Sequence, residues 1–182
     1  MVRVHVLGAS GAGTSTLGAA IADALAVPHL DTDNFYWLPT DPPFTSPRPR
    51  EERISTLMEK IESENGWVLS GSAIGWAQPL EPLYDLIVYV WLDPSIRMAR
   101  LREREQKRYG HRIARGGDLE GAHAAFLAWA ARYDTAGLEQ RSRAAHEAWL
   151  AKQRVPVIRL DTSRPVNNLV PEVLAAAGSS QP

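Results

Sequence analysis

The amino-acid sequence predicts a three-layer α/β sandwich in which helices cover both faces of a five-stranded parallel sheet. Short apolar runs alternate along the chain with segments whose apolar residues recur at helical spacing. The run 86–92 is apolar on both faces, which is typical of a strand in the middle of a parallel sheet. Strands that alternate with helices in this way form parallel sheets with a helical layer on either side.

The first half of the chain supplies three of the strands and two of the helices. We expect strands over 2–7, 28–31 and 67–69, because each is a short apolar run that ends in glycine or polar residues. Helices are expected after Gly13 and around 54–61, where apolar residues recur every three or four positions.

A proline-rich stretch separates the second strand from the helix that follows it. Five prolines fall within the eleven residues 39–49, too many for a helix or an interior strand. We therefore expect a surface loop here, close to the first glycine-rich loop of the chain.

The second half of the chain completes the sheet. After the strand at 86–92, a helix is expected from Asp93 to about Arg108, and a basic segment continues to Gly117. The remaining elements are two helices, a fifth strand and a last helix opened by a proline, expected at 120–134, 138–151, 155–160 and 165–174.

The chain length fits one folding unit. With 182 residues, of which 45% are apolar, a single domain can bury its own core. We expect that core to comprise about 1–94 and 153–176, with a basic lid at about 97–118 and a helical insert at about 119–151.

Composition excludes several classes of protein. The formal net charge of −1 gives no general attraction for nucleic acids, so any basic site is local. The absence of cysteine excludes disulfides, thiolate metal sites and cysteine nucleophiles, and it favours a cytoplasmic location. No segment has the roughly 20 apolar residues of a membrane span, so we expect no membrane association.

The glycine-rich loop after the first strand predicts phosphate binding. It matches the phosphate-cradling pattern G-x-x-x-x-G-K-[ST], except that threonine replaces lysine. Glycines let backbone amides point inward at phosphate oxygens, and the helix that follows adds a partial positive charge. The loop predicts a site for ATP or GTP with Mg²⁺, Ser15 supplying a metal ligand. The nucleotide-binding candidates are Gly8, Ser10, Gly11, Ala12, Gly13, Thr14, Ser15 and Thr16.

Two aspartates after the second strand are candidates for catalysis. Asp31 and Asp33 are two residues apart at the end of an extended segment, in the polar turn 31–34, so both side chains can face the cleft. One can hold Mg²⁺ through water, with Asp33 the metal candidate, and the other can accept a proton from a substrate hydroxyl. A helix cap or simple turn is the alternative. The aromatic residues 35–37 either stack on a substrate ring or belong to the core.

A row of arginines on the helix expected from Asp93 to about Arg108 is a second candidate site. Arginines recur every three or four residues from 97 to 108 and continue into the next loop, so they form a basic stripe suited to phosphate oxygens. An ordinary solvated face, interleaved with glutamates, is the alternative. The catalytic candidates nearest the expected lid are Arg104, Arg108 and Arg112.

These motifs together resemble the adenylate kinase and shikimate kinase group of P-loop kinases, in particular bacterial adenylate-kinase-like proteins with threonine in place of the loop lysine. The order of elements agrees along nearly the whole chain. The resemblance implies that the acceptor binds at the end of the second strand and that an arginine-rich lid closes over the phosphates. It also implies that the loop after the fifth strand touches adenine, where Arg164 either stacks on the base or flanks the last helix.

The sequence departs from this group at two positions. Thr14 removes the ammonium group that normally bridges the β- and γ-phosphates, and Ser70 stands where an acidic residue is expected after the third strand. A lid arginine together with Asp31 or Asp33 can compensate, which gives an active phosphotransferase acting on a small-molecule or nucleotide acceptor. Without compensation the protein binds nucleotide as a non-catalytic, regulatory module.

Two further classes of protein fit the sequence less well. A dinucleotide-binding fold would want glycine where Ser10 or Thr16 stands, depending on the register, so the NAD(P) fingerprint fails in both registers. An interaction protein that uses the six tryptophans at a surface groove has no sequence feature in its favour over core burial. The sequence leaves the acceptor and the oligomeric state open.

Overall fold

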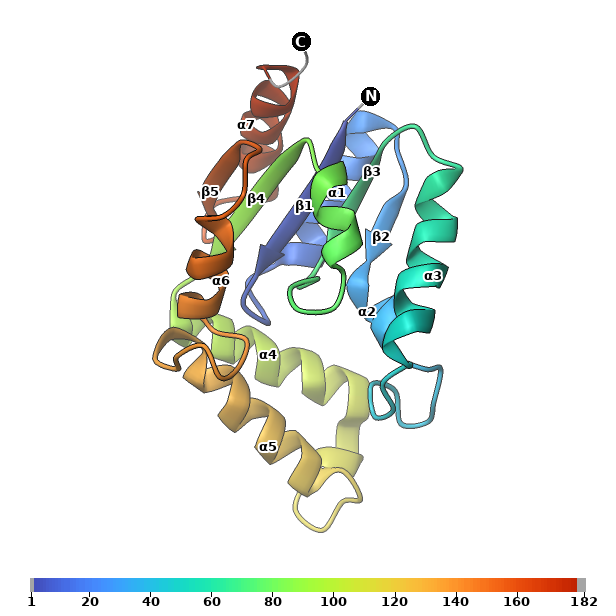
Figure 1. Cartoon of the computed structure of the whole chain (residues 1–182). Coiled ribbons are helices and arrows are strands. Elements are labelled where there is room, and N and C mark those ends of the chain that lie inside the picture. Colours follow the sequence, from blue (N-terminus) through green and yellow to red (C-terminus); the bar gives the residue numbers. More distant parts are fainter. Residues whose placement is uncertain (1, 180–182) are drawn as a thin grey trace.

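The sheet of the computed structural model, which describes residues 2–179, has five parallel strands, and it confirms the predicted α/β sandwich (Figure 1). The strand order is β2-β3-β1-β4-β5. The dinucleotide-binding fold instead places its second strand next to the first, so the order argues against the NAD(P) alternative. The strands are β1 (Arg3–Gly8), β2 (His29–Asp31), β3 (Trp67–Ser70), β4 (Leu86–Trp91) and β5 (Val157–Asp161).

Helices cover both faces of the sheet, as the alternating pattern predicts. Three further segments form short 3₁₀ turns, η1 (Gln78–Leu83), η2 (Gly110–Ile113) and η3 (Arg132–Asp134). The helices are α1 (Thr14–Leu25), α2 (Thr32–Tyr36), α3 (Arg50–Glu62), α4 (Pro94–Tyr109), α5 (Glu120–Ala131), α6 (Arg143–Leu150) and α7 (Val166–Ser179).

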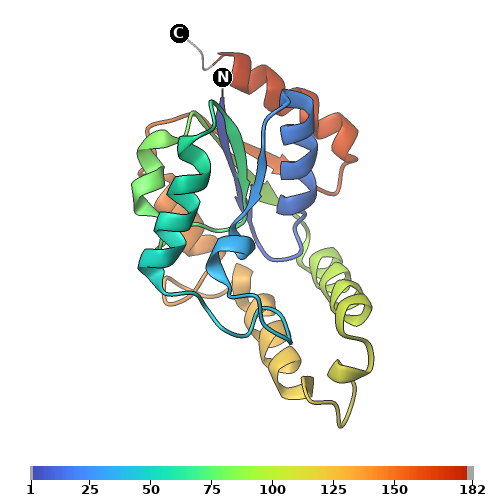
Figure 2. The ribbon, with the colours of Figure 1, turned by 90° about the vertical axis from the view of Figure 1, so that its right-hand side faces the viewer.

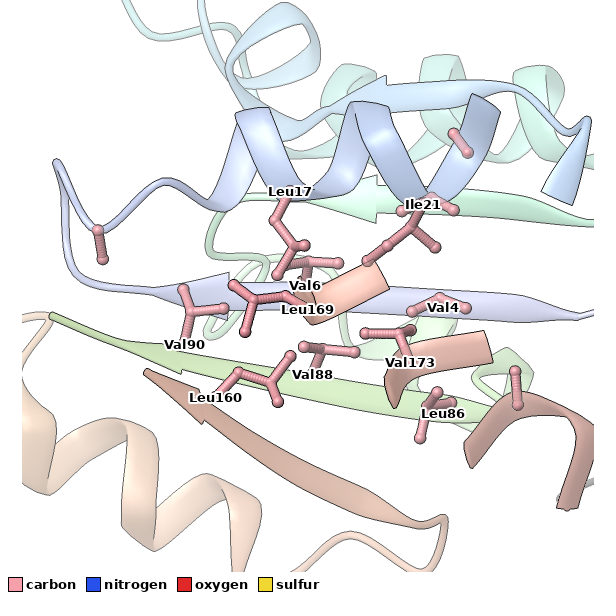
Figure 3. Close-up of a cluster of buried hydrophobic side chains, with 14 of the residues drawn as sticks. Val4, Val6, Leu17, Ile21, Leu86, Val88, Val90, Leu160, Leu169 and Val173 are labelled. Carbon is pink, nitrogen blue, oxygen red and sulfur yellow. The ribbon is translucent and has the colours of Figure 1, made fainter. Parts of the chain in front are cut away.

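One core lies between the sheet and the helices α1 and α7. Figure 3 shows Val4, Val6 and Val88 on the strands facing Leu17 and Ile21 of α1, with side chains of α7 beside them. The intervening residues of the same strands point to the opposite face, where α3, α6 and η1 pack over a second core. Central strands that are apolar on both faces therefore result from helices on both sides of the sheet.

The helices α4 and α5 extend beyond the carboxyl ends of the strands (Figures 1 and 2). They pack against each other through Met98, Leu101 and Ala130, with the aromatic residues of α5 beside them. This pair forms one wall of the space above the carboxyl edge of the sheet, opposite the loop that follows α2.

One local prediction is wrong, and another is decided in favour of its alternative. At 31–34 the Asp31 carboxylate accepts a hydrogen bond from the amide of Asp33 and starts the helix α2, which is the helix-cap alternative and not a simple turn. The helix expected at 138–151 begins only at Arg143, because the hydroxyl of Ser142 accepts from the amide of Ala145 and caps α6 there. The residues before this cap form a connection instead, which brings them to the carboxyl edge of the sheet.

Candidate active site

A cavity of about 780 Å³ lies at the carboxyl edge of the sheet. Its lining comes from the glycine-rich loop, the start of α2, the proline-rich loop, α4, α5 and the segment before α6. The carboxyl ends of parallel strands meet at one edge, so segments far apart in the sequence converge here. Most of the predicted nucleotide and catalytic residues line this cavity, namely Gly8, Ser10, Gly11, Thr14, Ser15, Asp31, Asp33, Arg104 and Arg108.

The glycine-rich loop has the conformation that phosphate binding requires. A Cβ atom at Gly8 would lie 2.5 Å from the carbonyl oxygen of Val90, so only glycine lets the loop leave the sheet here. Gly13 has a φ of 90° and open space around it, and it precedes α1. No side chain caps α1, and its first turn holds no acidic residue. The first amides of this helix are therefore available to an anion.

Two side chains outside the loop hold it in place. The hydroxyl of Thr162, after β5, donates to the carbonyl oxygen of Ala12 at 2.7 Å. The guanidinium of Arg97 donates to the carbonyl oxygen of Ser10 at 3.3 Å and pairs with Asp134 at 3.0 Å. Arg97 is therefore a buried support of the loop, which corrects its predicted place on an exposed basic stripe.

The remaining loop residues do not line the cavity. Ala12 is buried, Gly13 lies at the start of α1, and Thr16 is exposed on the surface of α1. Thr14 and Ser15 line the cavity, whereas Thr16 does not.

Asp31 lies beside the hydroxyl of Ser15. The Ser15 Oγ atom donates to the Asp31 carboxylate at 2.6 Å, and Ser70 Oγ approaches the same oxygen at 3.5 Å. Asp31 is the register partner of Ser70 across β2 and β3, and His29 bonds to the Ser70 hydroxyl at 2.9 Å. The acidic group that is missing at position 70 is thus supplied from the neighbouring strand.

Asp33 has a different environment from Asp31. The two do not share one extended segment, as the sequence analysis expected, because Asp33 lies in the first turn of α2. Its side chain is exposed and lines the cavity. Burial and the nearby Asp31 charge raise the pKa of Asp33, while Arg141 and Arg104 oppose this shift. The metal prediction paired Ser15 with Asp33, but the structure pairs Ser15 with Asp31.

Arg141 is a site residue that the sequence analysis missed. Its guanidinium donates to the hydroxyl of Ser10 at 2.5 Å and lies 4.7 Å from the ring centre of Trp129. Its Nε atom is buried with no hydrogen-bond partner, and no carboxylate in residues 2–179 forms an ion pair with it. Burial lowers the pKa of Arg141, and the nearby Asp33 carboxylate opposes the shift. The only sequence signal was its position directly before a serine that can cap a helix.

Arg104, Arg108 and Arg112 are already engaged with acidic groups. Arg104 bonds to Glu105 at 3.0 Å, and Arg108 lies 3.8 Å from the same carboxylate. Arg112 pairs with Asp118 at 2.7 Å and with Asp41 of the proline-rich loop at 2.9 Å. Arg112 does not line the cavity, so its predicted catalytic role has no contact in the structure to support it.

For the other predicted residues, the structure distinguishes between the alternatives given for each. Arg164 pairs with Glu172 of α7 on the surface, away from the cavity, which agrees with the helix-flanking alternative. Phe35 belongs to the core, whereas Tyr36 and Trp37 line the cavity. All six tryptophans lie within the described residues and none is exposed, so no tryptophan-rich surface exists there.

A buried hydrogen-bond chain ends at the cavity. The hydroxyls of Tyr89 and Tyr133 lie 2.9 Å apart, and the Tyr133 hydroxyl lies 2.8 Å from Nδ1 of His146. The other ring nitrogen of His146 lies 3.4 Å from the hydroxyl of Ser72, which also lines the cavity. Burial, together with the Arg141 charge, lowers the pKa of His146 to about 3. His146 is therefore neutral near pH 7 and its ring orients Ser72.

The oxygen groups at the loop are suited to Mg²⁺. No group of three or more histidine, aspartate or glutamate side chains in residues 2–179 is placed to hold a metal ion. Mg²⁺ at phosphate sites needs only one or two protein ligands, because phosphate oxygens and water complete its shell. The Ser15 hydroxyl and the Asp31 carboxylate are hard oxygen donors that already lie together.

Within residues 2–179, no helix is both long and apolar enough to cross a membrane.

A bacterial protein is similar in sequence to this chain over nearly its whole length. No family model matches the chain. The chain is 45% identical to the uncharacterized protein YqaC of Bacillus subtilis (strain 168) over 172 residues, which cover 94% of this chain and 95% of that protein.

Solved structures of small-molecule kinases have the same fold. A gluconokinase from Sinorhizobium meliloti 1021 superposes with a TM-score of 0.58 at 16% identity, over 98% of this chain and 92% of that one. A shikimate kinase from Bacteroides thetaiotaomicron superposes with a TM-score of 0.58 at 21% identity, over 96% and 97% of the two chains. The chain therefore has the fold of the P-loop kinases.

Proposed function

Because this chain belongs to the same family as YqaC of Bacillus subtilis and has the P-loop kinase fold, we propose that it is a phosphotransferase. It binds ATP with Mg²⁺ at the loop 8–16 and transfers the terminal phosphoryl group to a small acceptor in the adjoining cavity. The observation that carries this proposal is the convergence of an uncapped helix start, a hydroxyl–carboxylate pair and a buried arginine on one cavity.

The loop binds the phosphate chain through its backbone. The first residues of α1, Thr14 and Ser15, line the cavity, and the uncapped amides and the dipole of this helix favour negative charge there. Thr162 and Arg97 hold the loop carbonyls, so the amides keep their direction when no ligand is bound. Such preorganised donors act without the cost of rearrangement during the reaction.

Ser15 and Asp31 hold the metal ion in this proposal. When bound, Mg²⁺ neutralises charge on the phosphate oxygens and orients them for transfer. The Ser15 hydroxyl oxygen would be its ligand, and the Asp31 carboxylate, which accepts the hydrogen bond of that hydroxyl, would hold the hydroxyl in place. Ser70 and His29 hold the Asp31 carboxylate in place from β3 and β2.

Arg141 takes the role of the missing lysine. Thr14 has no charge, so the loop alone lacks a cation for the β- and γ-phosphates. The guanidinium of Arg141 reaches Ser10 in the middle of the loop and has an unused buried donor. A guanidinium without a carboxylate partner suits phosphate oxygens, which accept two parallel hydrogen bonds.

Asp33 is the base in this proposal. Asp33 lines the cavity, and its raised pKa makes its carboxylate a stronger base than that of an ordinary aspartate. It accepts the proton of the acceptor hydroxyl as the phosphoryl group transfers. We further propose that the segment 97–118 is the lid and that 119–151 is the insert that carries Arg141 to the loop.

A second candidate function is nucleotide binding without turnover. It is favoured by one observation, that Thr14 leaves no lysine in the loop. This candidate predicts nucleotide affinity that does not depend on Mg²⁺ and no effect of Asp33→Asn.

The test of the proposal is ATP turnover followed by phosphorus nuclear magnetic resonance. The purified chain is incubated with ATP, Mg²⁺ and a panel of hydroxyl acceptors that includes gluconate, shikimate and nucleoside monophosphates. We expect at least one acceptor to gain a phosphoryl group in a reaction that requires Mg²⁺ and that Asp33→Asn abolishes. Nucleotide binding with no transfer to any acceptor would favour the non-catalytic candidate instead.

A further inference from the structure

The cavity has two chemically different halves. The half next to the glycine-rich loop is polar and holds Asp31, Asp33 and Arg141. The other half, which we call the aromatic half, is lined by apolar side chains, among them six rings from α2, the proline-rich loop, α4 and α5. These rings are Tyr36, Trp37, Phe44, Tyr109, Phe126 and Trp129.

The first wall of the aromatic half comes from α2 and the proline-rich loop. The rings of Trp37 and Tyr36 meet edge to face with their centres 4.8 Å apart, and Trp37 meets Phe44 in the same way at 6.3 Å. Arg53 covers one side of the Tyr36 ring at 3.7 Å. This wall is thus supported from outside the cavity and does not depend on a ligand for its shape.

Phe44 has an unusual backbone. Its φ is 64°, a left-handed conformation that is uncommon for a residue other than glycine. The proline-rich loop holds Phe44 in this conformation while its ring contacts Trp37 on one side and lies 4.7 Å from the Arg108 guanidinium on another. Strained residues cluster at ligand sites, where the strain positions a side chain.

The second wall comes from α5. The rings of Phe126 and Trp129 are nearly parallel, with an angle of 28° and a centre separation of 6.1 Å. Arg141 lies over Trp129, so this wall begins where the polar half ends. A molecule that spans both halves therefore meets phosphate-binding groups at one end and ring faces at the other.

The charges of the aromatic half are unbalanced. Arg104 bonds to Glu105 and also interacts with the Asp33 charge, whereas Arg108 has only the Glu105 carboxylate nearby, at 3.8 Å, which Arg104 already occupies. A positive charge therefore remains next to the ring of Phe44. An anionic group on the ligand would neutralise it.

We propose that the aromatic half binds the acceptor by a planar ring, so that the acceptor is a ring-bearing anion and not a saturated polyol. This inference rests on the proposed phosphotransfer function. Flat rings bind between aromatic side chains by stacking, with little demand for hydrogen bonds. A polyol needs several hydrogen-bond partners, and this half offers mostly apolar side chains. Ser72 and Asp33 also line the cavity, and they remain available to bind the acceptor hydroxyl.

The experiment compares a sugar phosphate that carries a planar base with one that lacks the base. The full chain is saturated with Mg²⁺ and a non-hydrolysable ATP analogue, and then titrated calorimetrically with adenosine 5′-monophosphate, with ribose 5-phosphate and with gluconate. We expect the ring-bearing ligand to bind about tenfold to hundredfold more tightly than ribose 5-phosphate, the gain that base–aromatic stacking provides. Equal binding of the two phosphates, tighter binding of gluconate, or no binding of the monophosphate would overturn the inference.

Two variants of one residue locate the ring. Phe44→Leu keeps an apolar side chain but removes the ring, and we expect it to lower monophosphate affinity about tenfold. Phe44→Tyr keeps the ring and should bind like the unaltered protein. Trp91→Leu, outside the cavity, is the control for general effects of losing an aromatic residue.

A titration with the ATP analogue alone separates this inference from the proposed function. Unchanged analogue affinity in Phe44→Leu, with weaker monophosphate binding, supports the ring site. A protein that does not bind the analogue at all contradicts the proposed function itself. Displacement of the analogue by the monophosphate would place the ring on the donor side and overturn the acceptor assignment.

Discussion

The Ser15 hydroxyl donates to the Asp31 carboxylate at 2.6 Å, across the gap between the start of α1 and the end of β2. This contact exists because β2 pairs with β3 in a register that sets Asp31 opposite Ser70. Asp31 therefore provides a carboxylate next to the loop hydroxyl, although position 70 holds serine and not an acidic residue. The contact connects the phosphate loop to the acceptor end of the cavity, where Asp33 follows two residues later.

Removing the Asp31 charge tests the metal site. We expect Asp31→Asn to weaken ATP binding about tenfold or more when Mg²⁺ is present, because the metal loses a hydrogen-bonded anion. Without Mg²⁺ the same variant should bind ATP as well as or better than the unaltered protein, since a repulsive charge is gone. Calorimetric titration measures both, with Asp23→Asn on the exposed side of α1 as the control. An equal loss with and without Mg²⁺ would contradict this role.

Replacing Arg141 tests the substitute for the loop lysine. We expect Arg141→Met to lower ATP affinity about tenfold to hundredfold, since a charged hydrogen-bond donor to phosphate is lost. Arg141→Lys should restore part of the affinity, because it returns the charge without the planar fork. Arg143→Met, at an exposed position on the same helix start, is the matched control and should leave affinity unchanged. An Arg141→Met protein that binds ATP normally would remove Arg141 from the site.

The contact between the proline-rich loop and the turn after α4 predicts a coupled pair. Arg112 joins Asp41 at 2.9 Å, and the Tyr109 hydroxyl reaches the carbonyl oxygen of Pro43 at 3.4 Å. Because this contact joins two segments whose residues Phe44 and Tyr109 line the cavity, Asp41→Arg and Arg112→Asp should each weaken binding of the ATP analogue a few-fold. The double variant Asp41→Arg/Arg112→Asp should recover most of that loss.

Thermal unfolding separates this coupling from an effect on stability. Asp41 is highly exposed, and exposed ion pairs add little to folding stability. All three variants should therefore unfold near the same temperature. A double variant as weak as the sum of the single variants would show that the pair is not coupled.

A buried histidine predicts acid sensitivity of the fold. Burial lowers the pKa of His5 from 6.5 to about 4, so the folded protein holds the neutral ring while the unfolded chain takes up a proton below pH 6.5. Stability is therefore lost as the pH falls from 6.5 toward 4, at about 1.4 kcal/mol per pH unit.

Urea unfolding at pH 7 and pH 5 measures the contribution of His5. Between these values the free energy of unfolding should fall by about 2 kcal/mol less in His5→Phe than in the unaltered protein. His111→Phe, at an exposed position, should keep the full pH dependence of the unaltered protein. An unchanged pH dependence in His5→Phe would contradict the buried neutral ring.

Local patterns were enough to predict the sheet, most of the helices and the glycine-rich loop. The loop could be predicted because its glycines, hydroxyls and helix start lie within nine consecutive residues. The strand 86–92 could be predicted because burial on both faces leaves a continuous apolar run. In each case neighbouring residues in the sequence carry the whole signal.

The rest of the site depends on contacts between distant segments. The pairing of Asp31 with Ser15 follows from strand register, which the sequence does not display. Arg141 is 131 positions from Ser10, and only the path of the insert brings them together. Arg97 shares the spacing of the exposed arginines on α4, but it lies on the face that packs toward α5. Spacing on a helix shows which residues share a face and not what that face meets.

The central claim is that the loop 8–16 binds the phosphate chain of a nucleotide. It is tested most directly by calorimetric titration with ATP, GTP and NADP⁺, each with and without Mg²⁺, on the unaltered protein and on Gly13→Asp. Gly75→Asp is the matched control, because Gly75 also has a positive φ of 83° and open surroundings but lies outside the loop. The account predicts binding of ATP or GTP that Mg²⁺ strengthens, that Gly13→Asp abolishes and that Gly75→Asp leaves intact; binding of NADP⁺ alone, or of no nucleotide, would contradict it.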